Sequence, residues 1–259
     1  FLGIASVIMS GIILKKTKLF LGDVSPFVME LPAYHLPGVV NVLRSMWERG
    51  WSFVKKAGSI ILISAVIVWF LSSFGFTDEG FGMVDDLSDG MLAGIGSAIA
   101  FIFAPLGFGR WDAAVATITG LVAKENVVGT MGVLYGFAEV SEEGMEMWEA
   151  FAVNFTALSA YAFLVFNLYC PPCFAAIGAI KREMNNGKWT LFAISYQLLF
   201  GYTLALMVYQ LGSFLSGAGF TAGTVAGLAV LGLYIWLLVR RPGGIKPVAR
   251  DRENYKAAA

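Results

Sequence analysis

The stretch Phe166–Glu183, FNLYCPPCFAAIGAIKRE, contains both cysteines of the protein, with two prolines between them. It lies within a long apolar run, Phe151–Ile180, that otherwise has the composition of a membrane-spanning helix. Adjacent prolines cannot both continue a helix, because each lacks an N–H donor and its ring crowds the preceding turn. Broken backbone at bilayer depth is tolerated only where it is buried in protein or lines a wet cavity. The sequence therefore predicts an interrupted span with two thiols, Cys170 and Cys173, at the break.

The overall composition is that of an integral membrane protein. Of the 259 residues, 58% are hydrophobic and 14% are charged, whereas soluble domains carry about 25% charged residues. The formal net charge is +0 at pH 7, so no nucleic-acid partner is indicated. Two closely spaced cysteines in an apolar segment do not make a secreted disulfide framework. No GxxxxGK[ST] phosphate loop or other catalytic motif is present, so we assign no nucleotide hydrolysis to this chain.

The apolar runs predict an all-α, polytopic membrane helical bundle with broken helices and about seven spans. The first run is truncated, because it is shorter than the roughly 20 residues that a span needs, and we therefore expect the sequence to be part of a longer protein. The runs are Phe1–Leu14, Ala57–Phe74, Met91–Leu106, Ala113–Tyr135, Ala150–Tyr169 with an extension to Ile180, Thr190–Leu211 and Gly223–Val239.

The connections between the runs alternate in charge. Lysines and arginines gather after the first run, before the second, after the broken span and in the tail that begins at Arg240. The connections Gly75–Gly90 and Glu139–Glu149 contain acidic residues and no base. The positive-inside rule then places the basic segments and the C-terminus in the cytoplasm. Between the first two spans, residues 38–56 place apolar side chains opposite basic ones at helical spacing, which predicts an amphipathic helix. This helix would lie at the membrane interface or, as the alternative, contact a cytoplasmic domain.

Two adjacent charges, Lys124 and Glu125, lie near the middle of the run Ala113–Tyr135 and are followed by Asn126. One charge at a bilayer centre costs roughly 2.5–3.5 kcal/mol. Neighbouring helical residues point about 100° apart, so the two charges cannot easily pair with each other. One interpretation is a polar break that lines a pathway. The other is a structural clamp, in which Lys124 caps helix ends and Glu125 pairs with an arginine.

The residues alone leave three interpretations of Cys170 and Cys173 open. A reduced pair is a good ligand for Fe(II), Zn or Cu(I); a CxxC pair can be a redox couple; and cysteine is often simply a buried small residue. His35, the only histidine, lies in the proline-rich connector Pro26–Pro37, where interfacial hydrogen bonding is favoured over metal handling with Glu30. Asp112 is predicted to N-cap the helix that follows it.

Four stretches together resemble the membrane portion of the FeoB-type ferrous iron transporters of bacteria and archaea. They are PFVMELPAYHLP (Pro26–Pro37), GRWDAAVATITGLVAKENVVGTMGVLYG (Gly109–Gly136), YCPPCFAAIGAIKREM (Tyr169–Met184) and GKWT (Gly187–Thr190). The resemblance implies passage of Fe(II) into the cytoplasm across a prokaryotic cell (inner) membrane. It also implies GTP binding and hydrolysis in an upstream GTPase domain, contact with membrane lipid, and a possible homo-oligomer and small accessory cytoplasmic protein as partners.

The resemblance also assigns parts and residues. Residues 1–37 would be the end of a preceding membrane repeat with its connector, residues 57–211 a gate-like membrane core, and residues 212–259 the final span and a basic cytoplasmic tail. Cys173 matches the family's Pro-Cys position, and the expected metal ligands are Cys173, Cys170 and Glu125. The expected pathway-lining residues are Lys124, Asn126 and Tyr169. The alternatives are a membrane thiol–disulfide oxidoreductase that uses the CPPC pair, and a membrane scaffold that anchors a GTPase.

Overall fold

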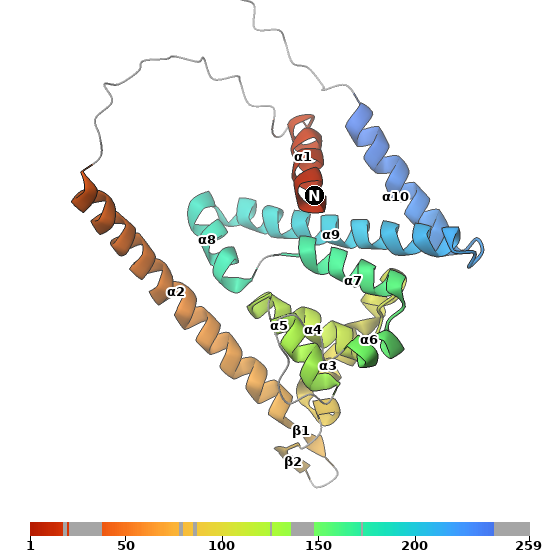
Figure 1. Ribbon diagram of the computed structural model, residues 1–259, viewed down its shortest axis with the longest axis horizontal. Helices are drawn as coiled ribbons and strands as arrows, with labels where there is room; N and C mark the ends of the chain where they lie inside the picture. Colours follow the sequence, from red (N-terminus) through yellow and green to blue (C-terminus); the bar gives the residue numbers. More distant parts are fainter. Residues whose placement is uncertain are drawn as a thin grey trace, which may run out of the picture. The chain divides into compact units, whose positions relative to one another are not determined.

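Figure 1 shows the computed structural model of the protein. The structure describes residues 1–17, 20, 38–77, 80–84, 87–124, 126–135, 148–171 and 173–240, and these are mostly helical, as predicted. The elements are α1 (Leu2–Lys15), α2 (Val39–Ser73), β1 (Phe74–Thr77), β2 (Gly80–Met83), η2 (Leu87–Asp89), α3 (Met91–Phe103), η3 (Ala104–Leu106), α4 (Trp111–Val122), α5 (Asn126–Leu134), α6 (Trp148–Asn154), α7 (Ala157–Tyr169), α8 (Phe174–Met184), α9 (Gly187–Leu215) and α10 (Ala222–Val239).

The chain forms two compact units, which are Phe1–Tyr34 with Leu231–Ala259, and His35–Val230. In the first unit the C-terminal ends of α1 and α10 cap each other. The Lys16 ammonium donates to the carbonyl oxygen of Leu238, and Arg240 Nη2 donates to the carbonyl oxygen of Lys16 at 3.2 Å. The last carbonyls of a helix have no intrahelical partner and carry partial negative charge, so cations at these ends satisfy them.

Two of the described helices, α9 and α10, are long and apolar enough to cross a membrane. A third span is possible if Met91–Leu106 and Trp111–Val122, which meet at an angle of 100°, form one broken crossing. The described part of the chain thus supports two or three membrane spans. The predicted number of about seven stays a prediction.

Helix α2 continues without a break for 35 residues, through the position where the sequence predicts an interfacial helix to end and a span to begin. Trp47 and Trp51 stack one turn apart on its first half, with ring centroids 6.0 Å apart, and both are exposed. At its end the chain forms an antiparallel hairpin of β1 and β2, in which Phe76 pairs with Phe81. This small sheet is an addition to the predicted all-α fold, and it arises because Phe and Gly alternate in FGFT and GFGM, a two-residue period that suits a strand.

The segment predicted as one crossing, Ala113–Tyr135, is instead a helical hairpin of α4 and α5. Thr119 Oγ1 lies 2.8 Å from Thr130 Oγ1, and Tyr135 Oη donates to Asp112 Oδ2 at 3.1 Å, so the two helices run antiparallel. Gly120 permits their close approach, because a Cβ there would lie 2.5 Å from a methyl group of Val127. With 12 and 9 residues, these helices are about 18 and 14 Å long, too short to cross a core of about 30 Å.

The hairpin bears on the predicted crossing at Ala113–Tyr135, because its antiparallel helices bring the end of α5 back beside the start of α4. Whether this segment crosses a membrane stays a prediction. The acidic connection that follows it lies outside the described residues.

An ion pair closes the open end of this hairpin. Asp112 is buried at 2% exposure and accepts hydrogen bonds from Arg110 Nε at 3.0 Å and from the Tyr135 hydroxyl. The prediction that Asp112 is the N-cap is wrong, because the extended residue before α4 is Arg110 and Asp112 already belongs to the first turn. There the carboxylate also complements the positive end of the helix.

The core of the second unit is a cluster of aromatic rings between α3, α7 and the turn after η3. Phe108 is fully buried, stacks on Phe103 at 5.4 Å and meets Phe163 edge-on at 5.3 Å. Gly107 forms the turn with a φ of 85°, and the Tyr209 ring of α9 lies directly against it. Lipid tails are as apolar as these rings, so close packing rather than exclusion of water favours the cluster in a bilayer.

The Gly107 turn provides a test of this packing. Gly107→Ala places a Cβ within 2.0 Å of the Tyr209 ring and forces a left-handed backbone on alanine. The backbone alone costs about 1–2 kcal/mol, so we expect a lower midpoint of thermal unfolding in detergent. Gly94→Ala is the matched control, since a Cβ there meets nothing within 4 Å. Equal midpoints for the two variants would contradict the packing described.

The ion pair at the open end of the hairpin provides a second test. Asp112→Ala leaves the Tyr135 hydroxyl and the Arg110 guanidinium without their shared acceptor. We expect a loss of about 1–3 kcal/mol in unfolding free energy, which is typical for unpaired polar groups at a buried site. Tyr135→Phe keeps the ion pair and should cost less. If Asp112→Ala unfolds at the same denaturant concentration as the parent protein, the ion pair does not hold the hairpin.

Candidate functional site

Two helix interruptions, far apart in the sequence, meet in the second unit. The first lies between α4 and α5 and contains Lys124, and the second lies between α7 and α8 and contains Cys170. The Lys124 ammonium donates to the carbonyl oxygen of Asn167 at 2.8 Å and to Cys170 Sγ at 2.7 Å. These contacts join a charged hairpin tip to a thiol at a broken helix.

The break at the CPPC sequence has a local cause. Thr156 N-caps α7 by accepting a hydrogen bond from the Ser159 amide, and α7 then ends at Tyr169. Cys170 still donates its backbone N–H to Phe166, but Pro171 has no N–H to continue the ladder. Helix α8 starts at Phe174. The predicted interruption of this run is therefore confirmed.

Lys124 satisfies a free end of α7. The carbonyl of Asn167 is one of the last four of the helix, which lack intrahelical donors and carry partial negative charge. The ammonium therefore caps a helix end, as one of the two interpretations of Lys124 proposes. The other interpretation, a polar break that lines a pathway, is compatible with the same contacts and stays a prediction.

Asn167 contributes an unused acceptor to this site. Its Nδ2 donates to the Phe163 carbonyl oxygen at 3.0 Å, whereas its Oδ1 is buried and has no hydrogen-bond partner among the residues that the structure describes. That oxygen lies 3.8 Å from the position that a Cβ on Gly120 would take, so it faces the α4–α5 hairpin. The sequence analysis did not single out Asn167. A polar residue three positions before Cys170, on the same helix face, was the available signal.

Helix α9 packs against the break from another side. A Cβ on Gly201 would lie 3.1 Å from the backbone nitrogen of Cys170 and 3.2 Å from Cβ of Tyr169, so any larger residue would have to push this backbone back by a few tenths of an ångström. The Tyr169 ring meets Phe200 edge-on at 5.7 Å. One turn earlier on α9, Gln197 Oε1 is buried and finds no partner within the described part of the chain. Tyr169 thus packs on α9, and its predicted role beside a pathway stays a prediction.

The two thiols differ in their surroundings. Cys170 is 5% exposed and contacts Lys124, whereas Cys173 is half-buried and is the N-cap residue before α8, without a side-chain capping hydrogen bond. Both are free cysteines. Among the described residues, no group of three or more histidine, cysteine, aspartate or glutamate side chains could hold a metal ion. Glu125 and His35 lie outside those residues, so the predicted ligand set of Cys173, Cys170 and Glu125 stays a prediction.

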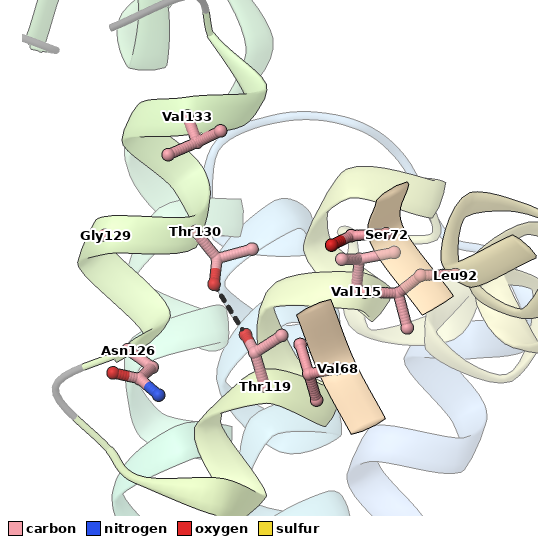
Figure 2. Close-up of a pocket in the computed structure, with 9 residues that line it drawn as sticks. All are labelled: Val68, Ser72, Leu92, Val115, Thr119, Asn126, Gly129, Thr130 and Val133. Atoms are coloured by element: carbon pink, nitrogen blue, oxygen red, sulfur yellow. Dashed lines mark hydrogen bonds between the residues drawn. The ribbon is translucent and has the colours of Figure 1, made fainter. Parts of the chain in front are cut away.

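Asn126, the third residue of the polar tip, begins α5 and lines a separate pocket. Figure 2 shows this pocket, which has a volume of about 300 Å³ and is bounded by α2, α3, α4 and α5. Its lining combines four aliphatic side chains with four polar ones, and the hydroxyls of Thr119 and Thr130 are hydrogen-bonded to each other. The lining residues are Val68, Ser72, Leu92, Val115, Thr119, Asn126, Gly129, Thr130 and Val133.

Two protein-family models match the chain. The model Gate, described as "Nucleoside recognition", matches residues 54–187, which contain both helix breaks. The model FeoB_C, described as "Ferrous iron transport protein B C terminus", matches residues 1–49. The Gate match covers more than half of the chain.

Several curated proteins named Fe(2+) transporter FeoB are similar to the chain. The one from Methanocaldococcus jannaschii is 36% identical over 218 residues, which are 83% of this chain and 31% of that protein. One from Staphylococcus aureus is 34% identical over 211 residues (82% and 30%), and one from Salmonella typhi is 30% identical over 289 residues (93% and 37%). The chain therefore spans about a third of the length of these relatives. No solved structure gives a significant match to the chain.

The chain belongs to the Gate family, and its predicted resemblance to the FeoB-type ferrous iron transporters is confirmed.

Proposed function

We propose that this chain is the membrane part of a ferrous iron uptake transporter and moves Fe(II) into the cytoplasm. The relatives named Fe(2+) transporter support this function over the thiol–disulfide oxidoreductase and the GTPase-anchoring scaffold. The structural observation that carries the proposal is the meeting of two helix breaks at Lys124 and Cys170. Transporters commonly bind cations where discontinuous helices expose carbonyl groups at their C-terminal ends.

The atoms at this junction suit Fe(II) as a transported ion. Fe(II) is borderline in softness and accepts sulfur, carboxylate and carbonyl ligands. Cys170 Sγ, the carbonyl oxygen of Asn167 and the free Asn167 Oδ1 offer sulfur and oxygen within one helical turn. Cys173 and Glu125 would add a second thiolate and a carboxylate. A transported ion must also leave, so an incomplete set of ligands favours transport over permanent binding.

The membrane arrangement belongs to the same proposal. Large apolar side chains are exposed along the described helices, among them Leu62, Ile63 and Val66 of α2, as contact with lipid requires. About seven spans are expected from hydropathy, and one fewer if the α4–α5 hairpin enters and leaves on one side. The basic tail after Val239 supports a cytoplasmic C-terminus, and the proposed location is a prokaryotic cell (inner) membrane.

The relatives are about three times as long as this chain, which leaves room in them for further domains. We propose that a GTPase domain upstream of the gate core couples GTP binding and hydrolysis to transport. A homo-oligomer and a small accessory cytoplasmic protein complete the proposed assembly.

Serine substitution tests the proposed iron station in the full-length transporter. Cys173→Ser and Cys170→Ser remove the thiolates and keep the side-chain volume nearly unchanged. We expect each to lower the rate of Fe(II) uptake into cells or vesicles by at least about tenfold, since even indirect partners of a metal site change affinity by this much. Uptake of radioactive iron, normalised to folded protein in the membrane, gives the measurement.

Ala179→Ser is the matched control for these variants. It changes a half-buried residue of α8 by a single hydroxyl, more than one helical turn beyond Cys173. Normal uptake in both cysteine variants would rule out the thiols as an iron station. A disulfide between Cys170 and Cys173 that forms and reduces in step with activity would instead favour the oxidoreductase.

A further inference from the structure

The Lys124 ammonium occupies the position that a cation bound to the junction would need. Its Nζ lies 2.8 Å from the carbonyl oxygen of Asn167 and 2.7 Å from Cys170 Sγ. A transition metal bound to the same two atoms would lie about 2.0–2.3 Å from each. The two positions overlap, so the ammonium and a metal ion cannot use this pair of atoms together.

The chemistry of the position explains why a lysine fits there. Both contacted atoms are acceptors, and the C-terminal end of α7 supplies a negative potential. An ammonium has three donors and no acceptor, so it binds these atoms as a small monovalent cation would. Two like charges at such short range in a low-dielectric site repel strongly. A divalent ion therefore has to displace the ammonium, and the ammonium weakens its binding.

The backbone allows Lys124 to move away. Lys124 lies outside both helices of the hairpin, between Ala123, which has an extended backbone, and the start of α5. Its side chain is a flexible four-carbon stem with a compact charge. The ammonium can therefore leave the α7 terminus without unwinding α4 or α5.

We propose that Lys124 is a tethered competitor of the transported ion. It fills the site at Asn167 and Cys170 when no metal is present and withdraws when a divalent metal binds. This role rests on the proposed function and extends it. The competing ammonium keeps the binding of the divalent metal weak enough for release. It also excludes monovalent cations, which carry the same charge as the ammonium. Lys124 is then a specificity-determining residue rather than only a helix cap.

Metal titration of the full chain in detergent tests this role. Co(II) serves as the probe, because its sulfur-to-metal absorption band reports thiolate ligation. Lys124→Met removes the charge and keeps the length of the stem. We expect it to tighten Co(II) binding by at least about tenfold, since one like charge beside the metal is removed. Lys124→Arg keeps the charge, and Lys188→Met changes an exposed lysine at the start of α9. Both should bind as the parent protein does.

The outcomes separate this inference from the function on which it rests. A Cys170-dependent band in the parent protein with unchanged or weaker binding in Lys124→Met overturns the competitor and leaves the iron station intact. A band that survives Cys170→Ser overturns the site itself. Reduced Fe(II) uptake in Cys173→Ser would then still support transport by this chain.

A second measurement uses the unaltered protein, in case Lys124→Met fails to fold. Acylation of lysine amines with and without Co(II), read by mass spectrometry, follows the position of the ammonium. We expect Co(II) to raise the labelling rate of Lys124 several-fold, since displacement exposes the amine, and to leave Lys188 unchanged. An unchanged Lys124 rate at saturating Co(II) overturns the proposal.

Discussion

The contact of one ammonium with a helix terminus and a thiol joins the α4–α5 and α7–α8 interruptions of the described chain. Lys124 reaches from the tip of the α4–α5 hairpin to Asn167 and Cys170, where α7 has just ended. In water each of these polar ends would be solvated. At bilayer depth they must satisfy one another, because an unpaired backbone carbonyl or charge costs several kcal/mol there. The two breaks stabilise each other, and each is tolerated because the other is present.

The same requirement shapes the neighbouring elements. Asp112, Arg110 and Tyr135 form a paired group at the other end of the hairpin, so both ends of these short helices carry matched polar contacts. Between the ends, small residues allow backbones to touch: Gly120 admits Val127 and Gly201 admits the backbone of Cys170. The polar ends thus determine which helices meet, and glycines determine how closely they pack.

Much of the helical content and the CPPC interruption could be predicted from the sequence, because proline and apolar run length act locally. The hairpin could not. A run of 23 residues from Ala113 to Tyr135 satisfies the length criterion for a span of roughly 20 residues, and hydropathy does not reveal that Thr119 pairs with Thr130. The Asp112 cap was wrong for a related reason. Asp112 does lie at the start of the helix, as aspartate prefers, but it belongs to the first turn, two residues after the N-cap Arg110. There it pairs with Arg110 and Tyr135.

The sequence by itself determined the membrane class and the break between Tyr169 and Phe174, because composition and proline geometry depend on no distant contact. Only the tertiary structure decided that Lys124 meets Cys170, which lies 46 positions further along the chain. It also revealed Asn167 Oδ1 as a buried acceptor with no partner among the described residues, which no local pattern distinguishes from an ordinary asparagine. Such pairings follow from how helices pack, and packing depends on contacts between surfaces that the linear order of residues does not specify.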